Sequence, residues 1–583
     1  MKEDIYNFID SNRKLYTLFI GVLLILGSCS KELLDKEPLD ALSKTVVYND
    51  LNLMTALVSS TYNGIASIHN GDRMGTETLG DLAYWFREFQ NGVGNYTNAL
   101  VDATNGEETT KDLWTRSYAT IRKINQFLED IKESSLKQED IDPLIGQMRF
   151  IRAYLYFDMM RWYGEVPLIT TYYTLEDENF EVARSNVEDI VAYISTETDA
   201  IIPLLPEEGP RSRPSKAAAM ALKAKTLLYA ASPLFNPSNE MSKWQVAADA
   251  NKAVMELTNY PLEDNYESLF NDSDIDDEII FAREYNKDIN QGAWSGANVL
   301  LWSGSLGGWS NVVPTNKYIS YFERSTDGVR PLLYNETTNT ISINSAATDF
   351  DPKDPYADLD PRFNAQMTFN QSIYKGKTME YWRSYSNDGT GAPDGRTPVD
   401  YGVDDTGAGD KTQTGLNFIK YTDPTVGVLQ SNNEAATNTP EIIFRTAEFY
   451  LNYAECQIAL GQEDNARAAI NKVRARPSVN MPPISATGSD LVAAYRRERA
   501  IELLLEDARW FDIRRWKIAE DVLGKPKLGT WIEKLSDGTF MYDYSRVPQD
   551  IGGYTWDDKL YLLPIPQSEI TKSNGALNQN PGY

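Results

Sequence analysis

Between residues 451 and 477, small and apolar side chains recur at nearly the spacing of a tetratricopeptide repeat, with the last proline one residue early. Such a unit is a helix-turn-helix that buries its apolar face only against a neighbouring unit, so about three or more units are expected. The spacing therefore limits the fold to stacked helix pairs. The positions that carry it are Ala454, Gly461, Ala466, Ile470 and Val473.

Weaker helix pairs of the same kind precede and follow this unit. A segment at 147–163 is apolar on both sides and predicts a helix packed between neighbours, and alanines at 215–231 let adjacent helices approach closely. Together the pairs predict a mainly α fold, a tetratricopeptide-like right-handed α-solenoid. The expected pairs are 112–133 with 141–163, 187–202 with 216–231, and 491–505 with 508–522.

A region rich in Gly, Asn, Asp and Thr interrupts the helical periodicity. The helical scaffold is expected over about 45–262 and 441–522, around an irregular insertion of about 263–440 with short helices and a few short strands. Long irregular segments in compact proteins usually carry function, so we expect the insertion to face a ligand. The Pro-punctuated apolar segment of about 523–583 is expected to pack back on the helices. Residues 29–583 would then form a single domain.

The first 28 residues are predicted to be a lipoprotein signal peptide. Arg13 and Lys14 precede an apolar run, Leu15 to Leu26, that is too short to cross a bilayer core, which needs about 20 helical residues. The run closes on Gly27-Ser28-Cys29, the shape of a bacterial lipobox in which the cysteine is acylated and becomes the first mature residue. The alternative is a plain secretory peptide. Acidic charge before Arg13 is unusual there and leaves the true start codon open.

Composition excludes several classes of function. The net charge of -28 disfavours nucleic acid and anionic membrane surfaces, which leaves the lipid on Cys29 as the expected membrane contact, and it favours a neutral glycan over a strongly anionic one. With Cys29 acylated, Cys456 has no partner for an intramolecular disulfide. His69 is the only histidine, which leaves no His-based zinc site. No phosphate-binding or dinucleotide-binding glycine motif is found, and no cofactor is expected.

Two sets of acidic residues are candidates for a calcium site and for a catalytic site. The loops at 272–278 and 351–360 could hold calcium, yet neither has the Asp-x-Asp-x-Asp-Gly spacing of a known calcium loop. Glu498, Glu502 and Glu506 share one face of a predicted helix, a spacing that resembles a pair of glycosidase carboxylates. Nearby arginines favour an ion-paired face instead, and no catalytic residue is predicted. These are Arg496, Arg499, Arg509, Arg514 and Arg515, and the same interpretation applies to Asp158 with Arg161.

Aromatic residues outside the predicted helices are the candidates for ligand binding, in a chain with 12 Trp and 34 Tyr. A tryptophan on a loop offers a ring face, on which the apolar face of a sugar stacks while neighbouring polar groups pair with its hydroxyls. Burial in the insertion core and contact with a partner protein are the alternatives for each ring. The predicted ligand-binding residues are Arg73, Trp85, Asn95, Tyr96, Trp294, Trp302, Trp309, Tyr381 and Trp382.

Ordered motifs along nearly the whole mature chain resemble the SusD/RagB family, the nutrient-binding outer-membrane lipoproteins of the Bacteroidetes type. The resemblance implies a tetratricopeptide-type platform, exposure at the cell surface, no catalysis, and a SusC-like TonB-dependent barrel transporter as partner. The lipoprotein would be the lid of that barrel and capture an oligosaccharide or, in some members, a peptide. The motifs include Cys29 with Leu34 to Pro38, Arg149 to Tyr154, Tyr163 to Leu168, Asp360 to Phe363, Asn452 to Glu455, Arg509 to Asp512, and Leu563 to Pro566.

Two further functions stay open at this point. A glycoside hydrolase is supported only by the abundance of carboxylates. A periplasmic repeat scaffold that binds another protein would share the helical architecture. Acidic Glu32 and Asp35 after the lipidated cysteine resemble the signal that sends such lipoproteins to the outer leaflet, although Lys31 and two leucines interrupt the acidic run.

Overall fold

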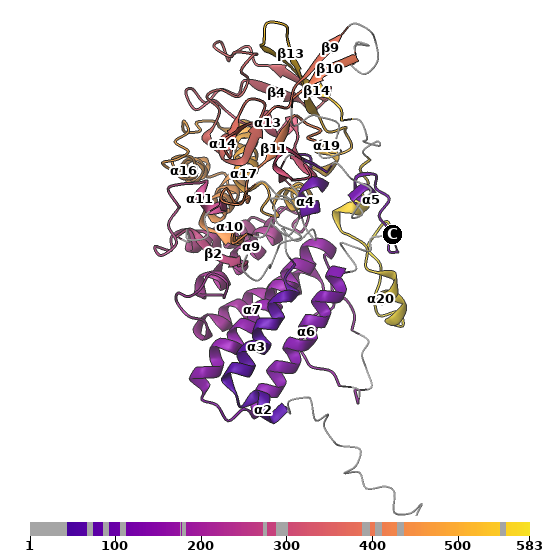
Figure 1. Ribbon diagram of the computed structural model, residues 1–583. Coiled ribbons are helices and arrows are strands. Elements are labelled where there is room, and N and C mark those ends of the chain that lie inside the picture. Colours follow the sequence, from indigo (N-terminus) through magenta and orange to yellow (C-terminus); the bar gives the residue numbers. More distant parts are fainter. Residues whose placement is uncertain are drawn as a thin grey trace, which may run out of the picture.

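The computed structural model arranges the chain as a helical body at one end and a strand-rich region at the other (Figure 1). Helices α3 (Leu51–Thr61), α6 (Asp112–Asp130) and α7 (Gln138–Tyr163) lie at the helical end. The structure describes residues 44–66, 74–85, 93–104, 112–174, 176–177, 182–271, 277–286, 301–302, 304–386, 397–402, 411–427, 437–548 and 555–583. The predicted signal peptide, Cys29 and His69 lie outside the described residues.

The main scaffold is a row of helices in which each packs against the next. From α6 and α7 the row runs on through five more helices, and the contacts follow the order of the row. The prediction of a mainly helical fold is confirmed, whereas the right-handed superhelix stays a prediction. The added helices are α8 (Val187–Ile201), α9 (Lys216–Ala231), α10 (Met241–Met255), α15 (Thr446–Ala459) and α16 (Glu463–Arg474).

Two expected helix pairs and the repeat-like unit are present, and the last pair is different. Helices α15 and α16 are joined by a tight turn in which Gly461 has a φ of 72°, a value that favours glycine. Residues 491–522 form α17 (Gly488–Leu503) and two short helices, α18 (Arg509–Arg515) and α19 (Ala519–Val522). Helix α18 packs against α4 (Met74–Leu79), so the expected second long helix of this pair is wrong. Lys517, at a φ of 57°, lies between α18 and α19 and interrupts the single helix expected over 508–522.

Helix α7 is the buried centre of the scaffold. Every side chain from Phe150 to Tyr163 is buried, as predicted from its two apolar faces. Gly164 ends the helix with a φ of 72°, and its N–H donates to the carbonyl of Met160. Helix α9 begins at the N-cap Ser215, whose Oγ accepts from the N–H of Ala218.

Helices α10 and α15 meet although the whole insertion separates them in the sequence. Trp244 and Ala247 of α10 share one buried cluster with Leu228 of α9 and Cys456 of α15. Strand β2 (Ile279–Arg283) pairs antiparallel with β12 (Glu441–Arg445) near the two ends of the insertion. The scaffold therefore continues across the insertion as one packed row.

The insertion contains short helices and small sheets. Its two-stranded sheets pair β1 (Ala83–Trp85) with β3 (Val312–Pro314), β6 (Met367–Phe369) with β11 (Leu416–Phe418), β4 (Leu332–Asn335) with β5 (Thr340–Ile343), and β7 (Ile373–Tyr374) with β8 (Lys377–Thr378). Its short helices are α11 (Ser268–Asn271), α13 (Asn316–Ile319) and α14 (Pro361–Gln366).

The C-terminal segment contributes to both ends of the molecule. Strands β13 (Gly529–Lys534) and β14 (Phe540–Arg546) complete a four-stranded sheet with β9 (Arg383–Ser386) and β10 (Thr397–Tyr401), in the order β10-β9-β13-β14. This part joins the insertion rather than the helices. The tail beyond it packs on the helices as predicted, because the N–H of Leu563 donates to the carbonyl of Trp162 at 2.9 Å.

None of the described helices is both long and apolar enough to cross a membrane. Cys456, the free cysteine of the described chain, is buried in the cluster of α9, α10 and α15. Its environment raises the pKa of the thiol well above the ordinary value because burial disfavours the thiolate.

Candidate ligand-binding site

Two of the predicted ligand-binding tryptophans lie in the core. Trp85 ends β1 and is 2% exposed, because β1 pairs with β3. Trp302 is 0% exposed and packs with Leu306 and Met379, while the Lys375 ammonium lies 4.1 Å from its ring centroid. The expectation that these loop tryptophans offer an exposed face is therefore wrong.

The predicted pair Tyr381 and Trp382 is also buried. Tyr381 and Trp382 are each 5% exposed and belong to the same core cluster as Trp302. The Tyr381 hydroxyl accepts from Nδ2 of Asn417 at 3.0 Å, and the ammonium of Lys534 lies 4.2 Å from the Trp382 ring. Both rings build the interior of the insertion, and the expectation of an exposed ring face is wrong for them too.

The remaining predicted residues divide between partly buried and undescribed positions. Tyr96 is buried in α5 (Val93–Thr97), which rules out an exposed ring face, and its neighbour Asn95 is half-buried. Trp309 is half-buried and packs against the core. Arg73 and Trp294 lie outside the described residues. A ligand-binding role for these five residues stays a prediction.

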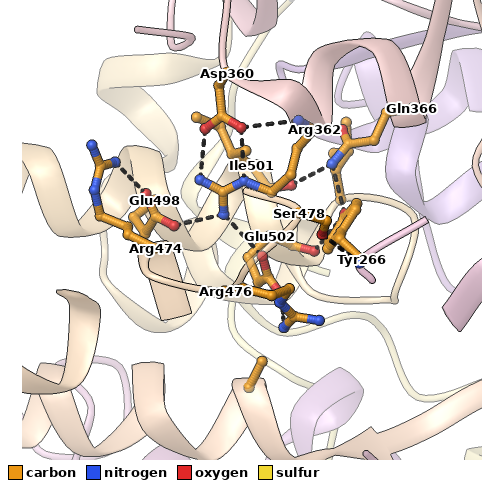
Figure 2. A network of polar contacts seen from close by, with 12 residues as sticks. Tyr266, Asp360, Arg362, Gln366, Arg474, Arg476, Ser478, Glu498, Ile501 and Glu502 are labelled. Atoms are coloured by element: carbon orange, nitrogen blue, oxygen red, sulfur yellow. Dashed lines mark hydrogen bonds and ion pairs between the residues drawn. The ribbon is translucent and has the colours of Figure 1, made fainter. Parts of the chain in front are cut away.

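The glutamates that suggested a glycosidase lie in a buried network of ion pairs (Figure 2). Nη1 of Arg362, from α14, lies 2.6 Å from Oε1 of Glu498 and 2.9 Å from Oε2 of Glu502. Nη1 of Arg445, from β12, lies 2.7 Å from Oε1 of Glu502, and its Nε lies 2.7 Å from Oε2 of Glu506. The ion-paired interpretation is confirmed, although α17 ends before Glu506.

The arginines that were expected to pair with these glutamates have other partners. Nε of Arg499 pairs with Asp512 at 2.7 Å, and Nε of Arg509 pairs with Asp81 at 2.8 Å. Arg515 pairs with Glu455 at 2.6 Å. Sequence proximity predicted the presence of ion pairs but not their partners, because the arginines that reach the glutamates come from α14, β12 and α16. Asp158 and Arg161 do pair with each other, at 2.8 Å.

The electrostatics of this network do not suit acid catalysis. A catalytic acid of a glycosidase needs a raised pKa and access to substrate. Burial alone would raise the pKa of Glu502, yet Arg445, Arg476 and Arg362 outweigh it and hold that pKa well below the ordinary value. The pKa of Glu498 is lowered in the same way by Arg362 and Arg474, against the effect of burial. The network therefore fixes α17 against the insertion and α16.

A polar hollow of about 320 Å³ opens where the end of α3 meets strands β2 and β12. We call it the Tyr62 hollow. It is large enough for a small ligand, since such sites usually measure about 300 to 1,000 Å³. Its walls combine aromatic rings with hydrogen-bonding groups. They are formed by Ser59, Tyr62, Asn63, Ile65, Ser212, Arg213, Phe281, Ala282, Arg283, Glu284, Tyr285 and Ile443.

Hydrogen bonds hold the walls of the Tyr62 hollow in place. The guanidinium carbon of Arg213 lies 4.5 Å from the Tyr62 ring centroid, and its Nη2 donates to Oγ of Ser59 at 2.8 Å. Nη2 of Arg283 donates to the carbonyl of Tyr62 at 3.2 Å. The Tyr285 hydroxyl donates to a carboxylate oxygen of Glu441 at 2.8 Å. Burial raises the pKa of Tyr62 to about 12, so its hydroxyl stays protonated at neutral pH.

None of the predicted ligand-binding residues that the structure describes lines the Tyr62 hollow. The residues that do, including Tyr62, Arg213 and Tyr285, carry no motif and lie far apart in the sequence. Arg73 and Trp294 follow two of these lining segments along the chain. The pairing of β2 with β12, together with the contacts of Arg283 and Arg213 with the end of α3, brings the walls together.

The acidic loops do not form a metal centre in the part of the chain that the structure describes. No group of three or more His, Cys, Asp or Glu side chains there could hold a metal ion. In the second loop, Asp360 pairs with Arg362 at 2.7 Å. Most of the first loop, residues 272–276, lies outside the described residues.

Two models of known protein families match the chain. Residues 277–583 match the model of the SusD family. The chain belongs to the SusD family. Residues 32–228 match a second model, described as SusD-like and starch-binding associating with the outer membrane. The two matches together cover most of the helical scaffold and of the insertion and the whole C-terminal segment, in agreement with the resemblance of the sequence motifs.

Relatives of this SusD-family chain match it over nearly its whole length. SusD-like protein P2 of Formosa agariphila is 23% identical over 602 residues, which cover 98% of this chain and 100% of the relative. A SusD-like protein structure from Bacteroides fragilis is 27% identical with a TM-score of 0.73, covering 94% of this chain and 100% of that one. A SusD-like carbohydrate-binding protein structure from the same species is 26% identical with a TM-score of 0.71, covering 91% and 99%.

Proposed function

We propose that this SusD-family chain is a cell-surface lipoprotein of the outer membrane that captures an oligosaccharide without turnover. The observation that carries the proposal is the Tyr62 hollow, whose aromatic rings and fixed polar groups suit a sugar. Family membership and the carbohydrate-binding relative from Bacteroides fragilis support the same ligand class. A peptide is the second candidate ligand, because the resemblance includes peptide-binding members.

The proposed partner is a SusC-like TonB-dependent barrel transporter, with this chain as its lid. The support is the resemblance of the sequence motifs to the family, together with the lipobox at Cys29. A lid held by lipid would raise the local concentration of ligand at the barrel entrance. Deletion of the chain from the producing cell should slow uptake of its ligand, and protease added to intact cells should cleave the protein. Protection from protease would contradict surface exposure and favour a periplasmic scaffold.

We expect Tyr285→Ala to weaken oligosaccharide binding by about 10-fold or more, because a ring in the wall of the Tyr62 hollow is lost. Arg213→Ala should weaken it similarly through the lost donor groups. Isothermal titration calorimetry with a panel of neutral oligosaccharides measures the effect. Arg122→Ala is the matched control, because Arg122 also lies over a tyrosine ring, that of Tyr172 at 5.0 Å, away from the hollow.

If both variants bound the oligosaccharide as tightly as the control, the ligand site would have to lie outside the Tyr62 hollow. A separate incubation of pure protein with polysaccharides tests for an enzyme. Release of reducing sugar would contradict the binding function, whereas intact polysaccharide supports it. Binding of peptides in place of oligosaccharides, lost in the same two variants, would keep the site and change the ligand class.

We expect Cys29→Ser to abolish membrane anchoring, because serine has no thiol to acylate. The variant should appear in the soluble fraction of lysed cells, and labelled palmitate should no longer be incorporated. Oligosaccharide affinity should be unchanged, since the lipid only tethers the domain. Membrane retention of the variant would show that Cys29 is not the anchor.

A further inference from the structure

A small basic cavity lies in the four-stranded sheet, apart from the Tyr62 hollow. Its volume is about 80 Å³, more than the ~10 to 15 Å³ that a single water needs. Arg383 of β9, Lys411, and Arg546 at the end of β14 line it, together with Trp531 of β13 and Gln413. Three cationic side chains thus meet at one cavity in a chain with a net charge of -28.

The guanidinium groups of Arg383 and Arg546 both lie against the ring of Trp531. The guanidinium carbon of Arg546 lies 3.7 Å from its ring centroid, and that of Arg383 lies 4.5 Å away. The Tyr385 ring is stacked on the same indole, with centroids 5.4 Å apart and an interplanar angle of 25°. Stacking on an aromatic ring fixes a guanidinium plane and leaves its N–H groups at the edge. The arginines are therefore held before any ligand arrives.

Arg546 differs from Arg383 in its pairing. Within the described residues, none of its nitrogens is part of a salt bridge, and the nearby carboxylate of Asp543 accepts from the N–H of Ser545 at 3.0 Å. Burial lowers the pKa of Arg546, and the nearby Arg383 cation lowers it further, against the opposing effects of Tyr385 and of the Asp543 carboxylate. By contrast, Arg383 lies opposite Glu533 in the pairing of β9 with β13. The charge that a ligand would balance is that of Arg546.

The geometry points to a second ligand site, in which Arg546, with Lys411 and Arg383 beside it, binds the anionic group of an acidic sugar. A carboxylate or a sulfate ester presents the paired oxygens that a guanidinium binds through two parallel hydrogen bonds. The Trp531 ring, against which both guanidinium groups lie, holds these donors in place. This inference goes beyond the proposed function, which places a neutral ligand in the Tyr62 hollow, and it stands without that hollow. It also reverses the preference for neutral glycans that net charge suggested.

The test uses the full chain carrying Cys29→Ser and three oligosaccharide probes of matched length. Oligogalacturonate carries carboxylates, an oligosaccharide of carrageenan carries sulfate esters, and a malto-oligosaccharide is neutral. We expect calorimetry to detect binding of at least one anionic probe, weaker at higher salt. Arg546→Gln should lower that affinity about 10-fold, and Arg546→Lys should lower it less, because lysine keeps the charge but loses the paired donors.

Arg122→Gln is the matched control and should bind the anionic probe as the parent does. Affinity of Arg546→Gln for the malto-oligosaccharide should be unchanged, whether or not Tyr285→Ala affects it. Carboxylate and sulfate probes distinguish the two sources of the anion. Two results would overturn the inference: no binding of either anionic probe by the parent, or equal binding by the parent, Arg546→Gln and Arg546→Lys. Far-ultraviolet circular dichroism verifies that each variant is folded.

Discussion

Glu502→Gln is expected to lower the free energy of unfolding by about 3 to 5 kcal/mol, the usual cost of removing one partner from a buried ion pair. The Glu502 carboxylate is 0% exposed and lies within salt-bridge distance of Arg362, Arg445 and Arg476. Glutamine keeps the shape but leaves three buried guanidinium groups short of one negative charge. Urea unfolding followed by tryptophan fluorescence measures the loss.

The matched control for this change is Glu520→Gln. Glu520 is exposed and makes no salt bridge in the described part of the chain, so its loss should change stability by no more than about 0.5 kcal/mol. A Glu502 variant as stable as this control would contradict a stabilising role of the network. Acid should produce a related effect. Because the folded-state pKa of Glu502 is lowered, its contribution is present above the ordinary glutamate pKa and is lost as the pH falls toward the folded value.

Glu77→Gln is expected to act in the opposite direction and stabilise the protein at alkaline pH. Both carboxylate oxygens of Glu77 are buried without a well-aligned hydrogen-bond partner among the described residues. Burial raises the pKa of Glu77 to about 8, and the Asp507 carboxylate adds to the shift against partial opposing effects of nearby backbone N–H groups and Lys420. In the unfolded chain Glu77 has the ordinary glutamate pKa of 4.5. As the pH rises, the unfolded chain therefore loses the Glu77 proton at a lower pH than the folded protein does.

The sign of the pH dependence follows from these two values. Below the unfolded pKa both states are protonated, and Glu77 costs little. As the pH rises from there toward 8, wild type loses about 1 kcal/mol of stability per pH unit relative to the glutamine variant. Paired urea titrations at pH 5 and pH 8 measure the difference. If the free energies of unfolding of wild type and Glu77→Gln differed by the same amount at both pH values, a raised pKa of Glu77 would be contradicted. The difference between wild type and Glu520→Gln should not change with pH.

The helical scaffold could be predicted because its signals are local. The spacing of Ala454, Gly461 and Ala466 specifies a turn between two helices within one stretch of chain. The two apolar faces of α7 likewise predict burial without knowledge of the neighbours. The prediction is wrong where helix continuity depends on tertiary contacts, as within 508–522, where α18 packs against α4 and Lys517, at positive φ, separates α18 from α19.

The ligand-facing residues could not be predicted, because exposure of a loop aromatic depends on distant segments. Trp85 and Trp302 lie outside the helices predicted from the sequence, yet β3 covers the first, and Leu306, Met379 and Ile419 pack in one buried cluster with the second. Tyr62 and Tyr285 meet only after β2 has paired with β12. The ion pairs show the same limit, since Glu502 pairs with arginines from three separate parts of the chain rather than with those beside it in the sequence.

The contact between α10 and α15 has a consequence for how the chain matures. During synthesis and export, α10 emerges before the insertion, while the helix that covers Trp244 and Ala247 follows it. Until α15 has been synthesised, the apolar face of α10 therefore stays exposed to water. Such an exposed face favours aggregation. Truncation within the insertion should leave a fragment that aggregates, not a smaller folded unit.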